Sequence, residues 1–150
     1  TWCPSYGPEM RGGTANCSVV ISDELVGSPL ISHDATAAVI MNLPSLTKFE
    51  KDILPGGVLL INSSLIEKKS SRDDIKVAYV EANKIAGDLG NSRAANMVML
   101  GALLSLDNIV SFESIQQAFI KVFGERKKEF LPGNEKALNA GAESVKGLIS

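Results

Sequence analysis

Cysteine, histidine and aromatic residues are scarce in this sequence. Its 150 residues include two cysteines, Cys3 and Cys17, and a single histidine. An iron–sulfur cluster takes four ligands, so two thiolates exclude a cluster held by this chain alone. A chain of this size and apolar content needs no disulfide to fold, and we therefore expect two free cysteines in or near the core.

An excess of positive charge is also absent. The chain has 15 Lys and Arg against 17 Asp and Glu, which gives a formal net charge of -2 and a pI near 5.4. Nucleic-acid binding domains usually gather basic residues on one face, so nucleic acid is not an expected partner.

Long apolar runs are missing as well. Stretches such as "MVMLGALLSL" fall short of the roughly 20 residues that span a bilayer, and no charged-then-apolar leader precedes them. We expect a cytoplasmic protein with no membrane partner. With 45% hydrophobic and 21% charged residues, the composition is that of one globular domain, predicted as 1–150, with a substantial core.

Short β-branched or fully apolar runs predict the strands of a sheet. "GVLLINS", at 57–63, is apolar throughout, which is typical of a strand buried on both faces of a parallel sheet. The predicted strands are 17–22, 36–42, 57–63 and 75–82.

Helical patterns fall between and after these strands. A short amphipathic helix at 46–53 is stopped by Pro55-Gly56-Gly57. Gly90 closes a helix that begins near residue 82, since glycine is favoured just beyond helix ends. The predicted caps are Asn91 or Ser92 for 93–106, Ser111 for 112–123 and Asn134 for 134–150.

The helix at 93–106 is apolar nearly all round, so it belongs either in the core or against a partner. We favour the core. If a partner contacts this part of the chain, Tyr6, Met10 and this helix are the first places to look.

Strands that alternate with helices indicate an α/β fold. We predict a mainly parallel sheet flanked by helices in a Rossmann-like three-layer arrangement, with a helix-rich C-terminal part. Such a sheet normally opens with a strand, a glycine-rich loop and a helix. That unit is missing here, so either the domain begins differently or its first element has been lost.

The opening loop "PSYGPEMRGGTANC" combines a fixed cation with exposed backbone amides. Arg11 beside Gly12, Gly13 and Thr14 is typical of a small anion-binding concavity. The alternative is a tight turn, in which the glycines permit positive φ and Arg11 pairs with Glu9.

Two further positions invite a functional interpretation. Arg93 and Asn96 begin a helix, where free amides and the helix dipole favour anions, although Arg93 could instead pair with Asp88 on the surface. His33 could act as a base near neutral pH. No nucleophile motif accompanies it, and we favour an exposed His33 beside an Asp34 that caps a turn.

Three stretches resemble a known family. "PSYGPEMRGGTANCSVVISDELVGSPLI", "GGVLLINSSLI" and "IAGDLGNSRAANMVMLGALL" are similar to the gamma subunit, or gamma domain, of the 2-oxoacid:ferredoxin oxidoreductases, and "LPGNEKALNAG" is similar to its closing helix. The resemblance covers nearly the whole chain. Family members usually begin with a strand and a G-x-G-G-Q-G loop, and this sequence starts after that point.

The resemblance implies a non-catalytic subunit of a multi-subunit enzyme, inactive alone. Such enzymes decarboxylate a 2-oxoacid oxidatively, transfer the acyl group to coenzyme A and pass electrons to ferredoxin. Thiamine diphosphate, magnesium and iron–sulfur clusters would sit on partner subunits (alpha, beta and a ferredoxin-like delta), and this chain would bind no cofactor or metal alone. From the anion-binding patterns described above, we expect the coenzyme A contacts to be Arg11, Gly12, Gly13, Thr14, Arg93 and Asn96; the alternative for the Arg11 loop is contact with a neighbouring subunit alone.

Two other functions stay open. One is a stand-alone nucleotide- or anion-binding α/β module, which would bind a phosphate ligand tightly without partners. The other is an NAD-dependent dehydrogenase, which is disfavoured because no G-x-G-x-x-G follows a strand.

Overall fold

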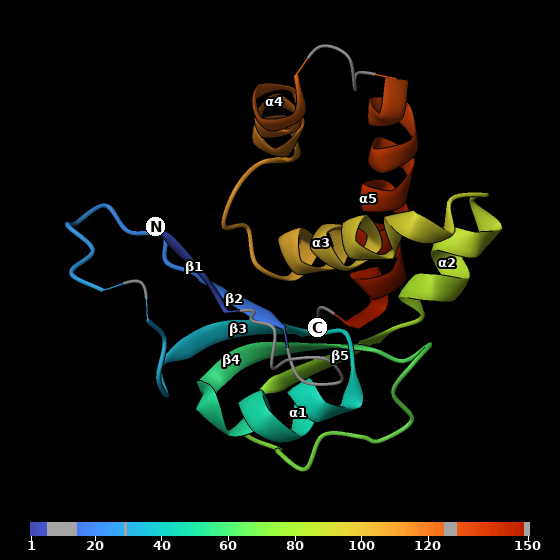
Figure 1. The fold of residues 1–150 in the computed structure, drawn as a ribbon. Helices are drawn as coiled ribbons and strands as arrows, with labels where there is room; N and C mark the ends of the chain where they lie inside the picture. Colours follow the sequence, from blue (N-terminus) through green and yellow to red (C-terminus); the bar gives the residue numbers. More distant parts are fainter. Residues whose placement is uncertain (6–14, 29, 125–128, 149–150) are drawn as a thin grey trace.

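A parallel three-stranded sheet forms the centre of the protein (Figure 1). The computed structural model describes residues 1–5, 15–28, 30–124 and 129–148. The strands lie in the order β3-β4-β5, with bounds β3 (Ala35–Ile40), β4 (Ile53–Asn62) and β5 (Lys76–Val80). Their parallel pairing places all three carboxyl ends at one edge of the sheet.

The two faces of the sheet carry separate cores. Along β4, Leu59 and Ile61 point to the face covered by α1 (Leu43–Phe49), where Leu46 is fully buried. Leu60 points to the opposite face. A strand buried on both faces needs this continuous apolar run, because successive side chains alternate between faces.

Three helices cover the second face: α2 (Ala82–Asp88), α3 (Ala95–Leu106) and α5 (Leu131–Val145). The helix α4 (Phe112–Phe123) stands apart from the sheet, above α3 in Figure 1. Val98 and Met99 of α3 are buried, as are Ala137 and Val145 of α5. The prediction that the helix at 93–106 belongs to the core is confirmed.

The predicted fold class is confirmed: a parallel sheet lies between helical layers, and the C-terminal part is rich in helix. Of the four predicted strands, those at 36–42, 57–63 and 75–82 occur as β3, β4 and β5 with shifted bounds. The predicted strand at 17–22 occurs as β2 (Asn16–Val19), but it pairs in a separate antiparallel sheet. No described helix is long and apolar enough to cross a membrane. The single-domain assignment of 1–150 stays a prediction.

An antiparallel hairpin of β1 (Trp2–Ser5) and β2 (Asn16–Val19) holds both cysteines. Cys3 lies opposite Ser18 and Pro4 lies opposite Cys17, so the two cysteines face opposite sides of the hairpin. Both thiols are free, as predicted. Their predicted place in or near the core is wrong for Cys17, which is exposed on a strand outside the central sheet.

The first helix begins one turn earlier than predicted. Asn42 caps α1 by accepting a hydrogen bond from the backbone of Ser45 at 2.9 Å, and Pro44 occupies the first turn, where its missing N–H costs nothing. A 3-10 turn, η2 (Glu50–Asp52), ends the helix. The predicted stop at 55–57 is wrong, because those residues already belong to β4 as a bulge opposite Thr36.

Two predicted caps are also wrong. No side chain caps α3, because the 3-10 turn η3 (Ser92–Ala94) precedes it and the Ala94 N–H bonds to the backbone oxygen of Asn91. Asn134 lies inside α5, which already begins at Leu131. Ser111 does cap α4, through the Ser114 N–H at 3.1 Å.

Gly90 ends the α2 region in the predicted way. It has φ +74, and the Asn91 N–H returns to the backbone oxygen of Ala86 at 2.9 Å. This positive φ is why a glycine occupies the position. A last 3-10 turn, η5 (Lys146–Leu148), follows α5.

Candidate functional site

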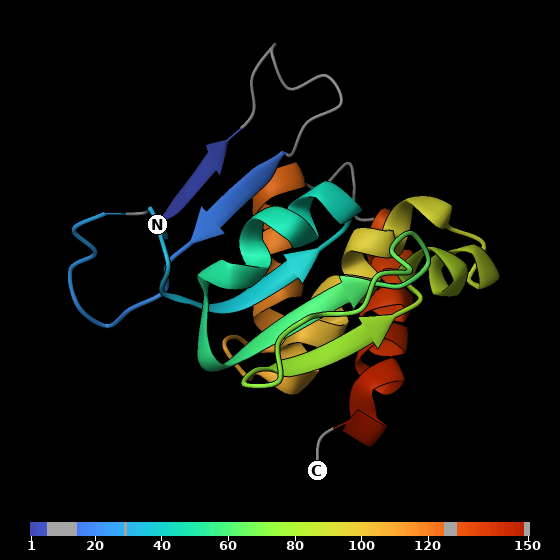
Figure 2. The same ribbon diagram turned by 90° about the horizontal axis from the view of Figure 1, so that it is seen from below.

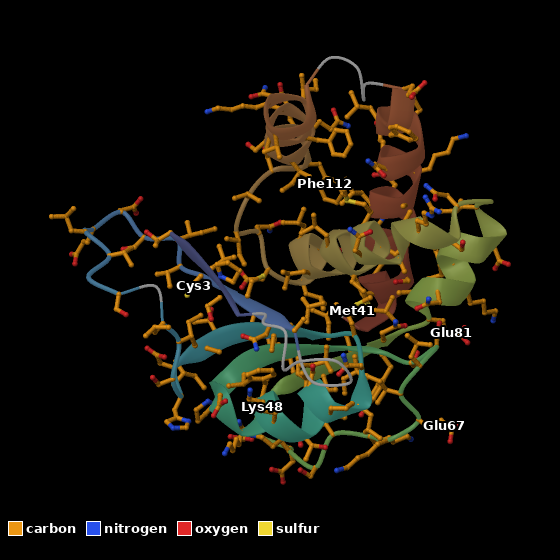
Figure 3. The ribbon with its side chains drawn as sticks, viewed as in Figure 1. Cys3, Met41, Lys48, Glu67, Glu81 and Phe112 are labelled. Carbon is orange, nitrogen blue, oxygen red and sulfur yellow. The ribbon has the colours of Figure 1, made fainter. Side chains whose placement is uncertain are left out.

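Amide side chains lie at the carboxyl edge of the sheet. Asn42 follows β3, Asn62 ends β4 and Asn83 follows β5 by three residues. Figure 2 shows the three strands pointing the same way, and Figure 3 shows Met41 and Glu81 towards that end. Ligands of open α/β sheets bind at the carboxyl ends of the strands.

Asn62 organises this edge. Its side chain is fully buried, and its Nδ2 donates to Oδ1 of Asn83 at 2.7 Å. Its Oδ1 accepts from the Ser64 N–H at 3.3 Å, and the Ser64 hydroxyl oxygen accepts from the Lys84 N–H at 3.3 Å. These bonds join the loop after β4 to the start of α2. A buried amide needs such partners, because leaving its polar atoms unpaired is costly.

Sequence reasoning missed Asn62 and Asn83. The available signal was positional: each follows the apolar core of a predicted parallel strand, where side chains reach the ligand-binding edge.

Arg93 and Asn96 lie at the same end of the molecule. Leu106 and Asp107, at the end of α3, line a cleft together with Thr36. Thr36 lies at the amino end of β3. The start of α3 therefore lies towards the carboxyl ends. Both Arg93 and Asn96 are exposed, and no ion pair joins Arg93 to Asp88.

The start of α3 has features that suit an anion. No side chain caps η3 or α3, so no described carboxylate or hydroxyl offsets the positive end of the helix dipole. Arg93 adds a cation one residue before the helix's N-cap. The arrangement can hold a negatively charged group, and the described residues near it present no nucleophile with a paired base.

The other predicted contacts, Arg11, Gly12, Gly13 and Thr14, lie outside the described residues, as do Tyr6, Glu9 and Met10. Whether they join Arg93 and Asn96 stays a prediction.

The amino edge of the sheet is held by ionic contacts. Arg72 donates to both carboxylate oxygens of Asp74, at 2.7 and 2.5 Å, and to the backbone oxygens of Glu50 and Ile53. Hydrogen bonds from the Arg72 guanidinium lower the pKa of Asp74. Arg72 thereby fastens the loop before β5 to the start of β4.

Glu50 is the buried carboxylate of this edge, with 8% of its surface exposed. Burial alone would raise its pKa, but hydrogen bonds from the hydroxyls of Ser70 and Ser71 and the N–H of Ser71, together with the charge of Lys68, lower the pKa below its ordinary value. This environment stabilises the ionised form, which suits a structural carboxylate rather than a proton donor.

His33 also belongs to the amino edge. Its Nδ1 lies 2.6 Å from Oδ1 of Asp52, and its side chain is 75% exposed. Asp34 Oδ1 accepts from the Ser32 N–H at 3.2 Å, so the predicted turn and the exposed histidine are confirmed. The partner Asp52, 19 residues away, was not predicted.

An open cleft of about 330 Å³ lies at this edge, between the β4 bulge and the end of α3. Leu54, Gly57, Lys76 and Asp107 are among its lining residues. Arg93 and Asn96, the two described residues of the predicted site, do not line it. Among the described residues, no three His, Cys, Asp or Glu side chains converge as a metal site would require.

The family assignment rests on nearly the whole length of the chain. A family model described as pyruvate ferredoxin/flavodoxin oxidoreductase matches residues 1–144. The chain belongs to this family.

Curated relatives agree. The chain is 40% identical over 144 residues to the ketoisovalerate oxidoreductase subunit VorA of Methanothermobacter thermautotrophicus, covering 95% of this chain and 29% of that protein. It is 30% identical over 151 residues to the 2-oxoglutarate synthase subunit KorC of Methanothermobacter marburgensis, covering 94% of this chain and 77% of that protein. The chain therefore spans under a third of VorA and about three quarters of KorC.

Solved structures share the fold. The gamma subunit of keto/oxoacid ferredoxin oxidoreductase from Geobacter sulfurreducens superposes with a TM-score of 0.77 at 30% identity, over 98% of this chain and 80% of that one. The 2-oxoglutarate:ferredoxin oxidoreductase of Magnetococcus marinus, solved with 2-oxoglutarate, coenzyme A and succinyl-CoA, has a TM-score of 0.66 over 77% of this chain and 20% of that one. At 23% identity the latter similarity concerns the fold alone.

Proposed function

We propose that this chain is the non-catalytic gamma-type part of a multi-subunit 2-oxoacid:ferredoxin oxidoreductase in the cytoplasm. The assembled enzyme would convert a 2-oxoacid to an acyl-CoA and carbon dioxide and pass the electrons to ferredoxin. The main support is the backbone similarity to a gamma subunit over 98% of the chain. The proposed partners are alpha, beta and ferredoxin-like delta subunits.

The redox and thiamine chemistry would belong to those partners. An iron–sulfur cluster takes four ligands, whereas this chain has two cysteines on opposite faces of a hairpin. Its residues therefore do not fit a cluster. Its contribution would be assembly and part of the coenzyme A site.

The proposed coenzyme A contacts are the segment from Arg11 to Thr14 together with Arg93 and Asn96. A relative of the same fold was solved with coenzyme A, and the uncapped start of α3 suits a phosphate. Arg93 could add a charge-assisted hydrogen bond to that phosphate.

Co-purification tests this function. The chain would be expressed with the alpha-, beta- and delta-type subunits of its own source, and the product assayed for 2-oxoacid- and coenzyme A-dependent dye reduction. A complex whose activity requires this chain is expected. A chain that stays alone, yet binds coenzyme A or inorganic phosphate tightly, would overturn the proposal in favour of an independent anion-binding module.

A substitution in the opening segment tests its role within that enzyme. Arg11→Ala should raise the KM for coenzyme A and leave the KM for the 2-oxoacid unchanged. An unchanged KM for coenzyme A would remove the segment from the proposed site.

A further inference from the structure

The apolar side chains of the strand β2 are more exposed than its polar side chains. Cys17 and Val19 are exposed, while Asn16 and Ser18 on the other face are half-buried. A two-sided strand normally shows the opposite arrangement, with apolar residues inward. The reversed pattern indicates that the outer face of β2 meets another surface.

The same character continues past the strand. We define the arm as β2 and the segment that follows it, residues 16–28 and 30–34. Val19 is 55% exposed, and the next three exposed apolar side chains are Ile21 (62%), Leu25 (102%) and Leu30 (69%). Single exposed apolar residues are ordinary, but several in one short segment mark an interaction site.

The arm stands away from both cores. In Figures 1 and 2 the segment after β2 projects beyond the sheet. β1 and β2 pair with each other, and no described helix or strand packs against them as extensively. The arm is therefore free to contact another chain without disturbing the core.

The charge of the arm is of one sign. Residues 12–47 contain no Lys or Arg, and their charged side chains are Asp23, Glu24 and Asp34. Asp23 and Glu24 are exposed and form no ion pair with any described residue. A surface that is apolar and anionic is complementary to one that is apolar and basic.

We propose that the arm docks, through Val19, Ile21 and Leu25, on an apolar surface bordered by Lys or Arg on a different subunit of the assembled enzyme. This inference rests on the proposed function for the existence of that subunit. A symmetric contact between two arms is disfavoured, because it would bring the unpaired carboxylates of Asp23 and Glu24 together with their own copies.

The apolar contact is tested by binding. The probe is the purified complex of the other subunits, co-expressed without this chain. The triple variant Val19→Ser/Ile21→Ser/Leu25→Ser should raise the Kd by at least about tenfold. The control Val122→Ser, at an equally exposed residue of α4, should change it less than about twofold. Because these side chains are exposed, both variants should keep the wild-type melting temperature.

The charges are tested by kinetics. Asp23→Lys/Glu24→Lys should slow association at low salt by about tenfold, and the difference should shrink as salt rises. A rate that is equal to wild type at low salt would contradict a basic partner surface.

Cys17 reports on the same face directly. In a Cys3→Ser background, reaction of Cys17 with a maleimide should be fast in the isolated chain and strongly slowed in the complex. Protection in the isolated chain at high concentration, with dimers in sedimentation, would instead mean that a second copy covers the arm and would overturn the proposal.

The outcomes separate the two hypotheses. If wild-type chain fails to bind the other subunits, the proposed function fails. If it binds them, but the triple variant binds equally well and Cys17 stays reactive, the complex stands and the docking role of the arm is wrong.

Discussion

Gly101 of α3 and Gly141 of α5 lie where the two helices cross, each against the backbone of the other helix. A Cβ on Gly101 would collide with the backbone of Leu138, and a Cβ on Gly141 would collide with that of Val98. Both collisions involve backbone atoms, which cannot rotate away. The pair allows the close approach of the helices that cover one face of the sheet.

Alanine at either glycine should therefore destabilise the protein. We expect Gly101→Ala or Gly141→Ala to lower the free energy of unfolding by about 1–3 kcal/mol or more, because overpacking forces the helices apart. Urea unfolding followed by circular dichroism measures the change. Gly87→Ala in α2, where a Cβ meets nothing within 4 Å, is the matched control and should be neutral or stabilising by up to about 1 kcal/mol. If the three variants lost equal amounts of unfolding free energy, the close contact between α3 and α5 would not explain the loss.

Stability should depend on pH through Glu50. The pKa of this carboxyl is lowered in the folded protein, so its stabilising contribution is present above the ordinary value of 4.5 and is lost as pH falls through the folded value. Glu50→Gln should cost roughly 1–2 kcal/mol near pH 7 and flatten the acid limb of the stability curve.

Unfolding curves between pH 7 and 3 give that comparison. Glu67→Gln, at an exposed carboxyl on the same connecting segment, serves as the control and should leave the curve unchanged. If the Glu50→Gln variant loses stability at low pH in the same way as the wild type, the hydrogen bonds from Ser70 and Ser71 do not stabilise the ionised Glu50 carboxylate.

The buried amide of Asn62 should make Asn83 important for stability. Asn83→Ala removes the acceptor for the Asn62 Nδ2, and we expect a loss of about 1–3 kcal/mol from the unpaired buried donor. Asn83→Asp keeps an acceptor oxygen and should retain most of the stability. If both variants unfold at the same denaturant concentration, the hydrogen bond contributes nothing specific.

Arg93 should affect coenzyme A use in the assembled enzyme. Arg93→Ala is expected to raise the KM for coenzyme A about tenfold with little change in kcat, because a phosphate contact far from the reacting atoms supports uniform binding. Arg93→Lys should restore part of the affinity. Lys121→Ala, an exposed cation on α4, is the control for lost positive charge. A ligand-bound structure with no anion near Ser92 to Asn96 would rule this site out.

The sequence by itself determined the elements whose signals are local. The apolar run at 57–63 predicts β4 because burial on both faces demands it, Gly90 marks a helix end because of its positive φ, and Ser111 caps α4 through its own hydroxyl. The anion site at the start of α3, inferred from the position of Arg93 before an apolar helix, stays a prediction.

Only the tertiary structure decided features that depend on residues distant in the chain. The contact between Gly101 and Gly141 requires two helices to cross, and the pairing of Asn62 with Asn83 requires two strands to end side by side. The exposure of Val19 depends on which face of the hairpin turns towards the body. A linear pattern predicts that a strand alternates, but the packing of the whole fold decides which side of it is covered.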